Sequence, residues 1–155
     1  MLLAVDLGLR TGLALYGRDG RLVSYRSQNL GTRARLRRAA GSVLSDHADA
    51  QRLVLEGGGD IADIWKKAAE RAERRVRVID AGVWRRALLL PREQRSGAGA
   101  KDAADGLARA VIEWSGAPRP KGALRHDAAE AIAVGLWGVI DAGWIGGVPE
   151  AVSRR

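Results

Sequence analysis

The sequence predicts an α/β protein with one mixed five-stranded sheet, three antiparallel strands followed by two parallel ones, flanked by helices. An Asp-Gly pair at positions 19 and 20 separates two short strand patterns, which is a strong hairpin signal. Strand and helix patterns then alternate between residues 32 and 79, which indicates parallel pairing through right-handed crossovers. Beyond residue 80 the patterns are helical, so helices are expected to cover the sheet.

The three antiparallel strands are predicted over residues 2–6, 13–16 and 21–25. The first is a continuous apolar run that ends at Asp6, as in a strand buried in the middle of a sheet. Residues 21–25 alternate between apolar and polar, as the returning strand of a hairpin does. A helix over residues 32–46 follows, with Thr32 as its N-cap.

The parallel strands are predicted over residues 52–56 and 76–79, with a helix between them that Asp60 caps and that runs to about residue 75. Loops are expected at residues 91–99 and 116–122, and the final helix is expected to begin near Leu124. We expect residues 1–145 to form a single domain and residues 146–155 a C-terminal tail.

The composition fits one basic globular domain. The chain has 155 residues, 46% of them hydrophobic, with 26 Lys+Arg against 18 Asp+Glu and a formal charge of +8. Most of the basic residues are arginines, whose guanidinium groups match phosphate oxygens, although a solubility charge or a codon bias would give the same composition. Because cysteine is absent, a disulfide framework, a thiol nucleophile and a cysteine-ligated zinc are excluded.

The start of the chain carries no basic segment typical of a secretory signal, and no apolar run approaches the ~18 residues of a membrane span. We therefore expect a cytoplasmic protein without a membrane partner.

Two acids stand where apolar strands end. Asp6 closes the first predicted strand, and Glu56 closes the fourth, directly before three glycines. A carboxylate in such a place is costly unless it is paired, caps a turn or binds a metal. Either acid alone is explained by a turn cap or an arginine partner. Together they indicate a site at the carboxyl ends of the central strands.

A third group of titratable residues opens the last helix. Asp127 and Glu130 share a helix face, as do His126 and Glu130, and two alanines between them allow close packing on the sheet. The alternative is that these acids only favour the first turn of a helix. Asp102 and Asp105 have the same spacing, and we interpret them as first-turn acids of another helix.

These three segments together resemble the RuvC family of Holliday-junction resolvases, which are ribonuclease H-like nucleases. Residues 4–12, Ala-Val-Asp-Leu-Gly-Leu-Arg-Thr-Gly, resemble the family's first-strand motif, and residues 53–56, Leu-Val-Leu-Glu, its second acidic strand. Residues 126–133, His-Asp-Ala-Ala-Glu-Ala-Ile-Ala, are similar to its C-terminal acidic helix. Their order and approximate spacing agree over nearly the whole chain.

The resemblance implies a ribonuclease H-like sheet and a catalytic site of four carboxylates, Asp6, Glu56, Asp127 and Glu130, that binds two Mg²⁺ ions, with Mn²⁺ able to substitute. Asp6 is expected to bridge the ions. His126 is either a further metal ligand or proton carrier, or simply a polar residue at the helix start.

The implied activity is that of a homodimeric, metal-dependent endonuclease. It would resolve four-way DNA junctions by paired symmetrical phosphodiester hydrolysis, leaving 5′-phosphate and 3′-hydroxyl ends, in a bacterial or phage setting. Two alternatives stay open: an RNA-processing nuclease like the RuvX/YqgF group, and a junction-binding protein without catalytic activity. The sequence does not identify a partner helicase.

The chain departs from the family pattern at two places. Glu130 stands where an aspartate is usual, and glycines follow Glu56 where the resolvases commonly have an aromatic residue that wedges into the junction. Trp65 could replace that aromatic by stacking on a base, or it could be a core residue. The candidate DNA contacts are Arg10, Trp65, Lys66, Lys67, Arg85, Arg86, Arg92, Arg95, Lys101, Lys121 and Arg125.

Overall fold

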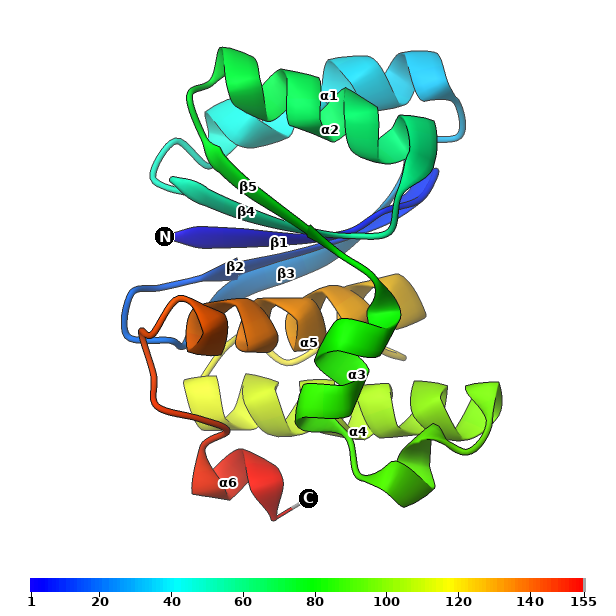
Figure 1. Ribbon diagram of the computed structural model, residues 1–155, viewed down its shortest axis with the longest axis vertical. Coiled ribbons are helices and arrows are strands. Elements are labelled where there is room, and N and C mark those ends of the chain that lie inside the picture. Colours follow the sequence, from blue (N-terminus) through cyan, green and yellow to red (C-terminus); the bar gives the residue numbers. More distant parts are fainter. Residues whose placement is uncertain (155) are drawn as a thin grey trace.

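A computed structural model describes residues 1–154 and gives the elements shown in Figure 1. The strands are β1 (Leu2–Asp6), β2 (Arg10–Tyr16), β3 (Leu22–Asn29), β4 (Arg52–Glu56) and β5 (Arg75–Ile79). The helices are α1 (Arg33–Asp46), α2 (Gly59–Arg71), α3 (Ala81–Leu88), a short 3₁₀ helix η1 (Pro91–Gln94), α4 (Gly97–Ser115), α5 (His126–Asp141) and α6 (Glu150–Ser153).

The five strands form one mixed sheet in the order β3-β2-β1-β4-β5. The pairs β1–β2 and β2–β3 are antiparallel, whereas β1–β4 and β4–β5 are parallel. This confirms the predicted fold class. The central position of β1 explains its apolar composition, because Leu3 and Val5 face one helical layer while Leu2 and Ala4 face the other.

Helices cover both faces of the sheet, as Figure 1 shows, with α1 and α2 on one face and α3, α4, α5 and α6 on the other. Leu36 and Val43 of α1 and Trp65 of α2 belong to the core cluster of the first face. The second core cluster is larger and includes almost the whole of α5, which is buried from Asp127 to Val139. A helix buried on every side fits a position between the sheet and α4.

Glycines allow α5 to lie directly on the sheet. A Cβ atom at Gly12 of β2 would lie 1.9 Å from the backbone oxygen of Asp127, and one at Gly135 of α5 would lie 2.2 Å from Cε2 of Tyr16. The Tyr16 hydroxyl donates a 2.6 Å hydrogen bond to the carbonyl oxygen of Ile132. These contacts fix where the first turn of α5 lies above the strand ends.

Helix α2 differs from the sequence prediction at both ends. It begins at Gly59 after Gly58 as N-cap, so Asp60 lies inside the first turn and does not cap the helix. It ends at Arg71, because Glu73 adopts a positive φ of 54° that a helix cannot continue through. The predicted helix end at residue 75 is therefore wrong, and Arg75 instead opens β5.

The predicted loop at residues 91–99 is also largely wrong. It contains η1, and Ser96 then caps α4 by accepting a 3.0 Å hydrogen bond from the backbone N–H of Gly99. Helix α4 therefore starts at Gly97, and Asp102 and Asp105 lie beyond its first turn. The Asp105 carboxylate accepts a 2.6 Å hydrogen bond from Arg109 Nε, so it stabilises the exposed face of α4.

Two helices, α5 and α6, form the C-terminal part of the described chain. Helix α5 begins at His126, two residues after the predicted start, and residues 150–153 form α6, which packs against α4. Val152 of α6 is buried in the larger core cluster. Within residues 1–154, no helix combines the length and apolar composition that crossing a membrane requires.

Candidate metal centre

Three carboxylates from three elements meet where the central strands end. Asp6 is the last residue of β1, Glu56 is the last residue of β4, and the parallel register places them side by side. Glu130 comes from the second turn of α5, which lies over these strand ends. One oxygen from each of the three carboxylates lies within 4.8 Å of the other two. This arrangement provides hard oxygen ligands that lie close enough together to hold a divalent cation.

The surroundings of Asp6 and Glu56 oppose the ionisation of their carboxyl groups. Glu56 and Glu130 are each only 9% exposed. Burial raises the pKa of Asp6 to about 8, and the negative charges of Glu56 and then Glu130 add to that rise. The pKa of Glu56 is also raised, first by burial and then by the charge of Glu130. Buried acids that also repel one another fit a cation-binding site, since a bound cation stabilises their buried charge and removes the repulsion.

Asp127 lies close to this cluster, but its carboxylate is bound by a side chain of β3. Its charge contributes to the raised pKa of Asp6, so it is part of the same electrostatic environment. Its Oδ2 accepts a short hydrogen bond from the Ser27 hydroxyl of β3, and Asp127 does not join the three carboxylates whose oxygens lie within 4.8 Å. The structure therefore brings all four predicted acids together, three of them tightly.

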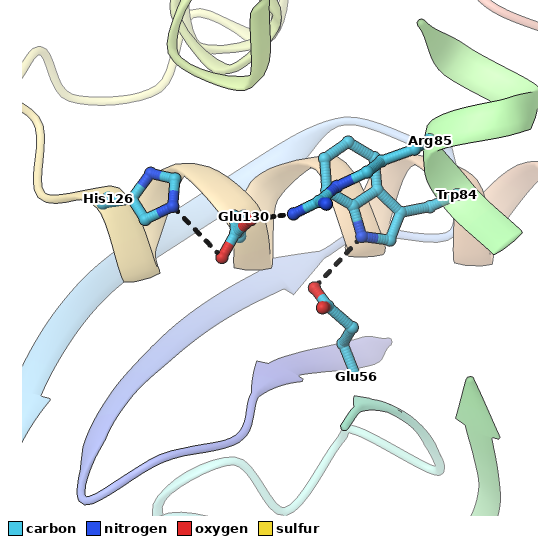
Figure 2. Close-up of polar contacts among 5 residues, drawn as sticks. All are labelled: Glu56, Trp84, Arg85, His126 and Glu130. Atoms are coloured by element: carbon cyan, nitrogen blue, oxygen red, sulfur yellow. Dashed lines mark hydrogen bonds and ion pairs between the residues drawn. The ribbon is translucent and has the colours of Figure 1, made fainter. Parts of the chain in front are cut away.

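Helix α3 places two neighbouring side chains on two of these acids (Figure 2). The Trp84 indole Nε1–H donates a 3.0 Å hydrogen bond to Oε2 of Glu56. Nη2 of Arg85 lies 2.8 Å from Oε1 of Glu130 and forms an ion pair with it. Helix α3 follows directly after the end of β5, the edge strand. Because β5 runs parallel to β4, α3 begins at the same end of the sheet as the acids.

Sequence reasoning missed Trp84 and Ser27 as site residues. Trp84 is fully buried, yet a tryptophan beside two arginines gives no signal of a carboxylate partner. Ser27 lies in β3 beyond the strand predicted for residues 21–25, because β3 extends to Asn29. Its pairing with Asp127 spans 100 residues and depends on where α5 crosses the sheet.

His126, a predicted candidate ligand or proton carrier, is the first residue of α5. Its Nε2 lies 3.4 Å from Oε2 of Glu130, on the opposite oxygen from Arg85 (Figure 2). The imidazole is partly exposed, so it lies between the acid cluster and solvent. Its role stays a prediction.

The structure decides between the two interpretations of Trp65. Its side chain is fully buried in the core between the sheet and α1, and its indole Nε1 has no hydrogen-bond partner among residues 1–154. A buried ring cannot stack on a base, so the interpretation of Trp65 as a DNA-wedging aromatic is wrong and the core interpretation is correct. The reason is the amphipathic pattern of α2, whose Ala62 and Ala69 face inward beside it.

The remaining candidate DNA contacts are spread over several elements, and their role stays a prediction. Arg85 lies within the acid cluster and is half-buried. Lys66 forms a 2.6 Å ion pair with Asp63 on α2. All candidates apart from Arg85 and Trp65 are exposed: Arg10, Lys66, Lys67, Arg86, Arg92, Arg95, Lys101, Lys121 and Arg125.

Compared by sequence, the chain matches no protein-family model and no curated protein. Compared by structure, it is similar to the RuvC protein of T. thermophilus solved in complex with a Holliday junction substrate, with a TM-score of 0.63 and 16% identity over 92% of this chain and 94% of that one. It is also similar to the yeast mitochondrial Holliday junction resolvase Ydc2, with a TM-score of 0.50 and 10% identity over 92% of this chain and 81% of that one. The chain therefore has the ribonuclease H-like fold of RuvC resolvases, as its motifs predicted.

Proposed function

We propose that this protein is a metal-dependent endonuclease that resolves four-way DNA junctions by paired, symmetrical phosphodiester hydrolysis, leaving 5′-phosphate and 3′-hydroxyl ends. One observation carries the proposal: Asp6, Glu56 and Glu130 converge within 4.8 Å at the carboxyl ends of β1 and β4. The fold shared with two junction resolvases supports DNA junctions as the substrate class.

The donor set fits Mg²⁺ or Mn²⁺, because it consists of carboxylate oxygens without thiolates and with a single imidazole at its edge. Asp6, Glu56 and Glu130 would hold the metal, with Asp127 completing the four-acid site. When bound, two such ions supply activation of the attacking water and stabilisation of the leaving 3′ oxygen.

The chain's own residues bind and orient the reacting groups. Trp84 donates a hydrogen bond to one oxygen of Glu56, so the other oxygen would be available to a metal ion. Ser27 likewise donates to one oxygen of Asp127. His126 lies at the solvent side of Glu130, where it would accept or deliver a proton. The exposed basic residues would bind the phosphate backbone without reading its sequence.

A second copy of the chain is part of the proposal. Four-way junctions have two-fold symmetry, and two matched cuts require two sites related by a two-fold axis. The expected active species is therefore a homodimer that presents one acid cluster to each of two opposed strands.

The test is cleavage of a labelled synthetic four-way junction by the parent and by Asp6→Asn, with Mg²⁺ and with EDTA. We expect paired nicks that require Mg²⁺ and that disappear in Asp6→Asn, while junction binding is retained. Asp102→Asn is the matched control, because it removes one exposed carboxylate from α4, outside the cluster, and should cut like the parent.

Other outcomes would redirect the proposal. Tight junction binding without cleavage in Mg²⁺ or Mn²⁺ would contradict nuclease activity and favour a binding protein. Cleavage that prefers RNA, or that ignores junction structure, would keep the metal centre and change the substrate.

A further inference from the structure

The acid cluster contains its own cation. Within the described chain, Arg85 is the one lysine or arginine that forms an ion pair with Asp6, Glu56, Asp127 or Glu130. Its Nη2 lies 2.8 Å from Oε1 of Glu130, one of the three acids that meet within 4.8 Å. A guanidinium therefore already binds a carboxylate that the proposed metal centre requires.

Arg85 is held in this place by few other contacts. Its guanidinium lies over the ring of Trp84, with its central carbon 5.3 Å from the ring centroid. Its Nε is buried and makes no hydrogen bond with any described residue, and its side chain is still 29% exposed. Among the described residues, the guanidinium thus has an Nε–H without a partner and one ion pair, with Glu130. Replacing Glu130 by another anion would therefore break few contacts.

Trp84, the residue before Arg85, has a different role. Trp84 donates to Glu56 through a neutral indole N–H, which adds no charge to the site and does not compete with a cation. Arg85 brings a full positive charge to the Glu130 carboxylate. A divalent cation and this guanidinium cannot both bind that carboxylate closely, because like charges in a partly buried site repel strongly.

We infer that Arg85 is a built-in counter-ion, which neutralises Glu130 in the metal-free protein, competes with a divalent cation for the Glu130 carboxylate, and contacts the substrate phosphate once it is displaced. This inference rests on the proposed function, since it assumes that the cluster binds metal. The planar guanidinium fork suits the phosphate role, because it can donate two parallel hydrogen bonds to phosphate oxygens.

The first test is Mn²⁺ binding measured by calorimetry without DNA, using the parent, Arg85→Gln and Arg85→Lys. Because Arg85→Gln removes the competing charge, it should bind Mn²⁺ about 3- to 10-fold more tightly. Arg85→Lys keeps the charge and should bind Mn²⁺ like the parent. The control is Arg38→Gln, which removes one exposed charge from α1, on the other face of the sheet, and should leave Mn²⁺ affinity unchanged.

The second test is single-turnover junction cleavage at saturating Mn²⁺. Arg85→Gln should cut about 100-fold more slowly than the parent despite its tighter metal binding, because a phosphate contact is lost. Arg85→Lys should recover part of that loss. Tighter metal binding combined with slower cleavage is a pattern that a purely structural role for Arg85 would not produce.

A third measurement uses the parent protein, so it does not depend on the folding of a variant. Side-chain ¹⁵N NMR should show the Arg85 Nε–H resonance shifting as Mg²⁺ is added, with no change at Arg38. Unchanged or weaker Mn²⁺ affinity in Arg85→Gln, or an unperturbed Arg85 resonance, would overturn the inference alone. If the parent binds no divalent cation, both this inference and the proposed metal-dependent function fail.

Discussion

Asp6 and Glu56 are direct register partners at the last position of the parallel strands β1 and β4. Two carboxylates on neighbouring strands at the same level repel each other, and their burial makes that repulsion stronger. A sheet built only for stability would not place acids at both positions. The free energy that this pairing costs is a measurable property of the metal-free protein.

The first prediction concerns the pH dependence of stability. The pKa of Asp6 is about 8 in the folded protein, against 3.8 for an ordinary aspartate, so the folded state holds a proton that the unfolded state releases. The free energy of unfolding of the metal-free parent should therefore fall as pH rises from about 4 to about 8. Because Asp6→Asn cannot ionise, its stability advantage over the parent should widen by about 1–3 kcal/mol across that window. Urea denaturation in EDTA at several pH values measures the difference, and a constant gap would contradict it.

The second prediction concerns the Trp84–Glu56 hydrogen bond. Trp84→Phe removes the N–H that orients Glu56 and should weaken Mn²⁺ binding about 10-fold, as is typical when a ligand loses its outer hydrogen bond. Trp65→Phe is a matched control, because Trp65 is equally buried but its indole N–H bonds no described residue. Calorimetry should show normal Mn²⁺ affinity in this control. Equal losses in both variants would mean that ring volume, and not the hydrogen bond, supports the site.

The third prediction separates the two acids of α5. Glu130 is among the three converging carboxylates, whereas Asp127 is engaged by Ser27. Glu130→Gln should weaken Mn²⁺ binding by about 100-fold, and Asp127→Asn by no more than about 10-fold. Equal losses of Mn²⁺ affinity in the two variants would contradict this prediction. They would mean that Asp127 breaks its hydrogen bond with Ser27 and ligates the metal directly, and Ser27→Ala should then bind Mn²⁺ more tightly than the parent.

The fourth prediction concerns the approach of α5 to β2. Because a Cβ atom at Gly12 would lie 1.9 Å from the backbone oxygen of Asp127, Gly12→Ala should force the start of α5 away from the sheet. We expect a loss of about 3 kcal/mol or more in the free energy of unfolding. Gly41→Ala is the control, since a Cβ atom at this position of α1 would meet no other segment of the described chain within 4 Å. It should raise the free energy of unfolding by about 0.5–1 kcal/mol. A stable Gly12→Ala protein with parent-like metal affinity would show that this close approach is unnecessary.

Local sequence patterns were sufficient to predict the fold class and the position of most acids. Apolar runs that end at Asp6 and Glu56 predict central strands, because only buried strands need continuous apolar side chains. The spacing of Asp127 and Glu130 predicts one helix face, because helix geometry is local. Local patterns gave the wrong bounds at the end of α2, where Glu73 takes a positive φ, and in residues 91–99, where η1 and the start of α4 replace the expected loop.

Which side chains meet depends on the tertiary structure. Ser27 and Asp127 are 100 residues apart, Arg85 and Glu130 are 45 apart, and Trp84 and Glu56 are 28 apart. No periodicity encodes such pairs, because they arise from the sheet order and from where α3 and α5 cross the strand ends. Trp65 is a different case, since the residue type alone allowed stacking on a base, whereas the amphipathic pattern of α2 places the ring on the buried face of that helix.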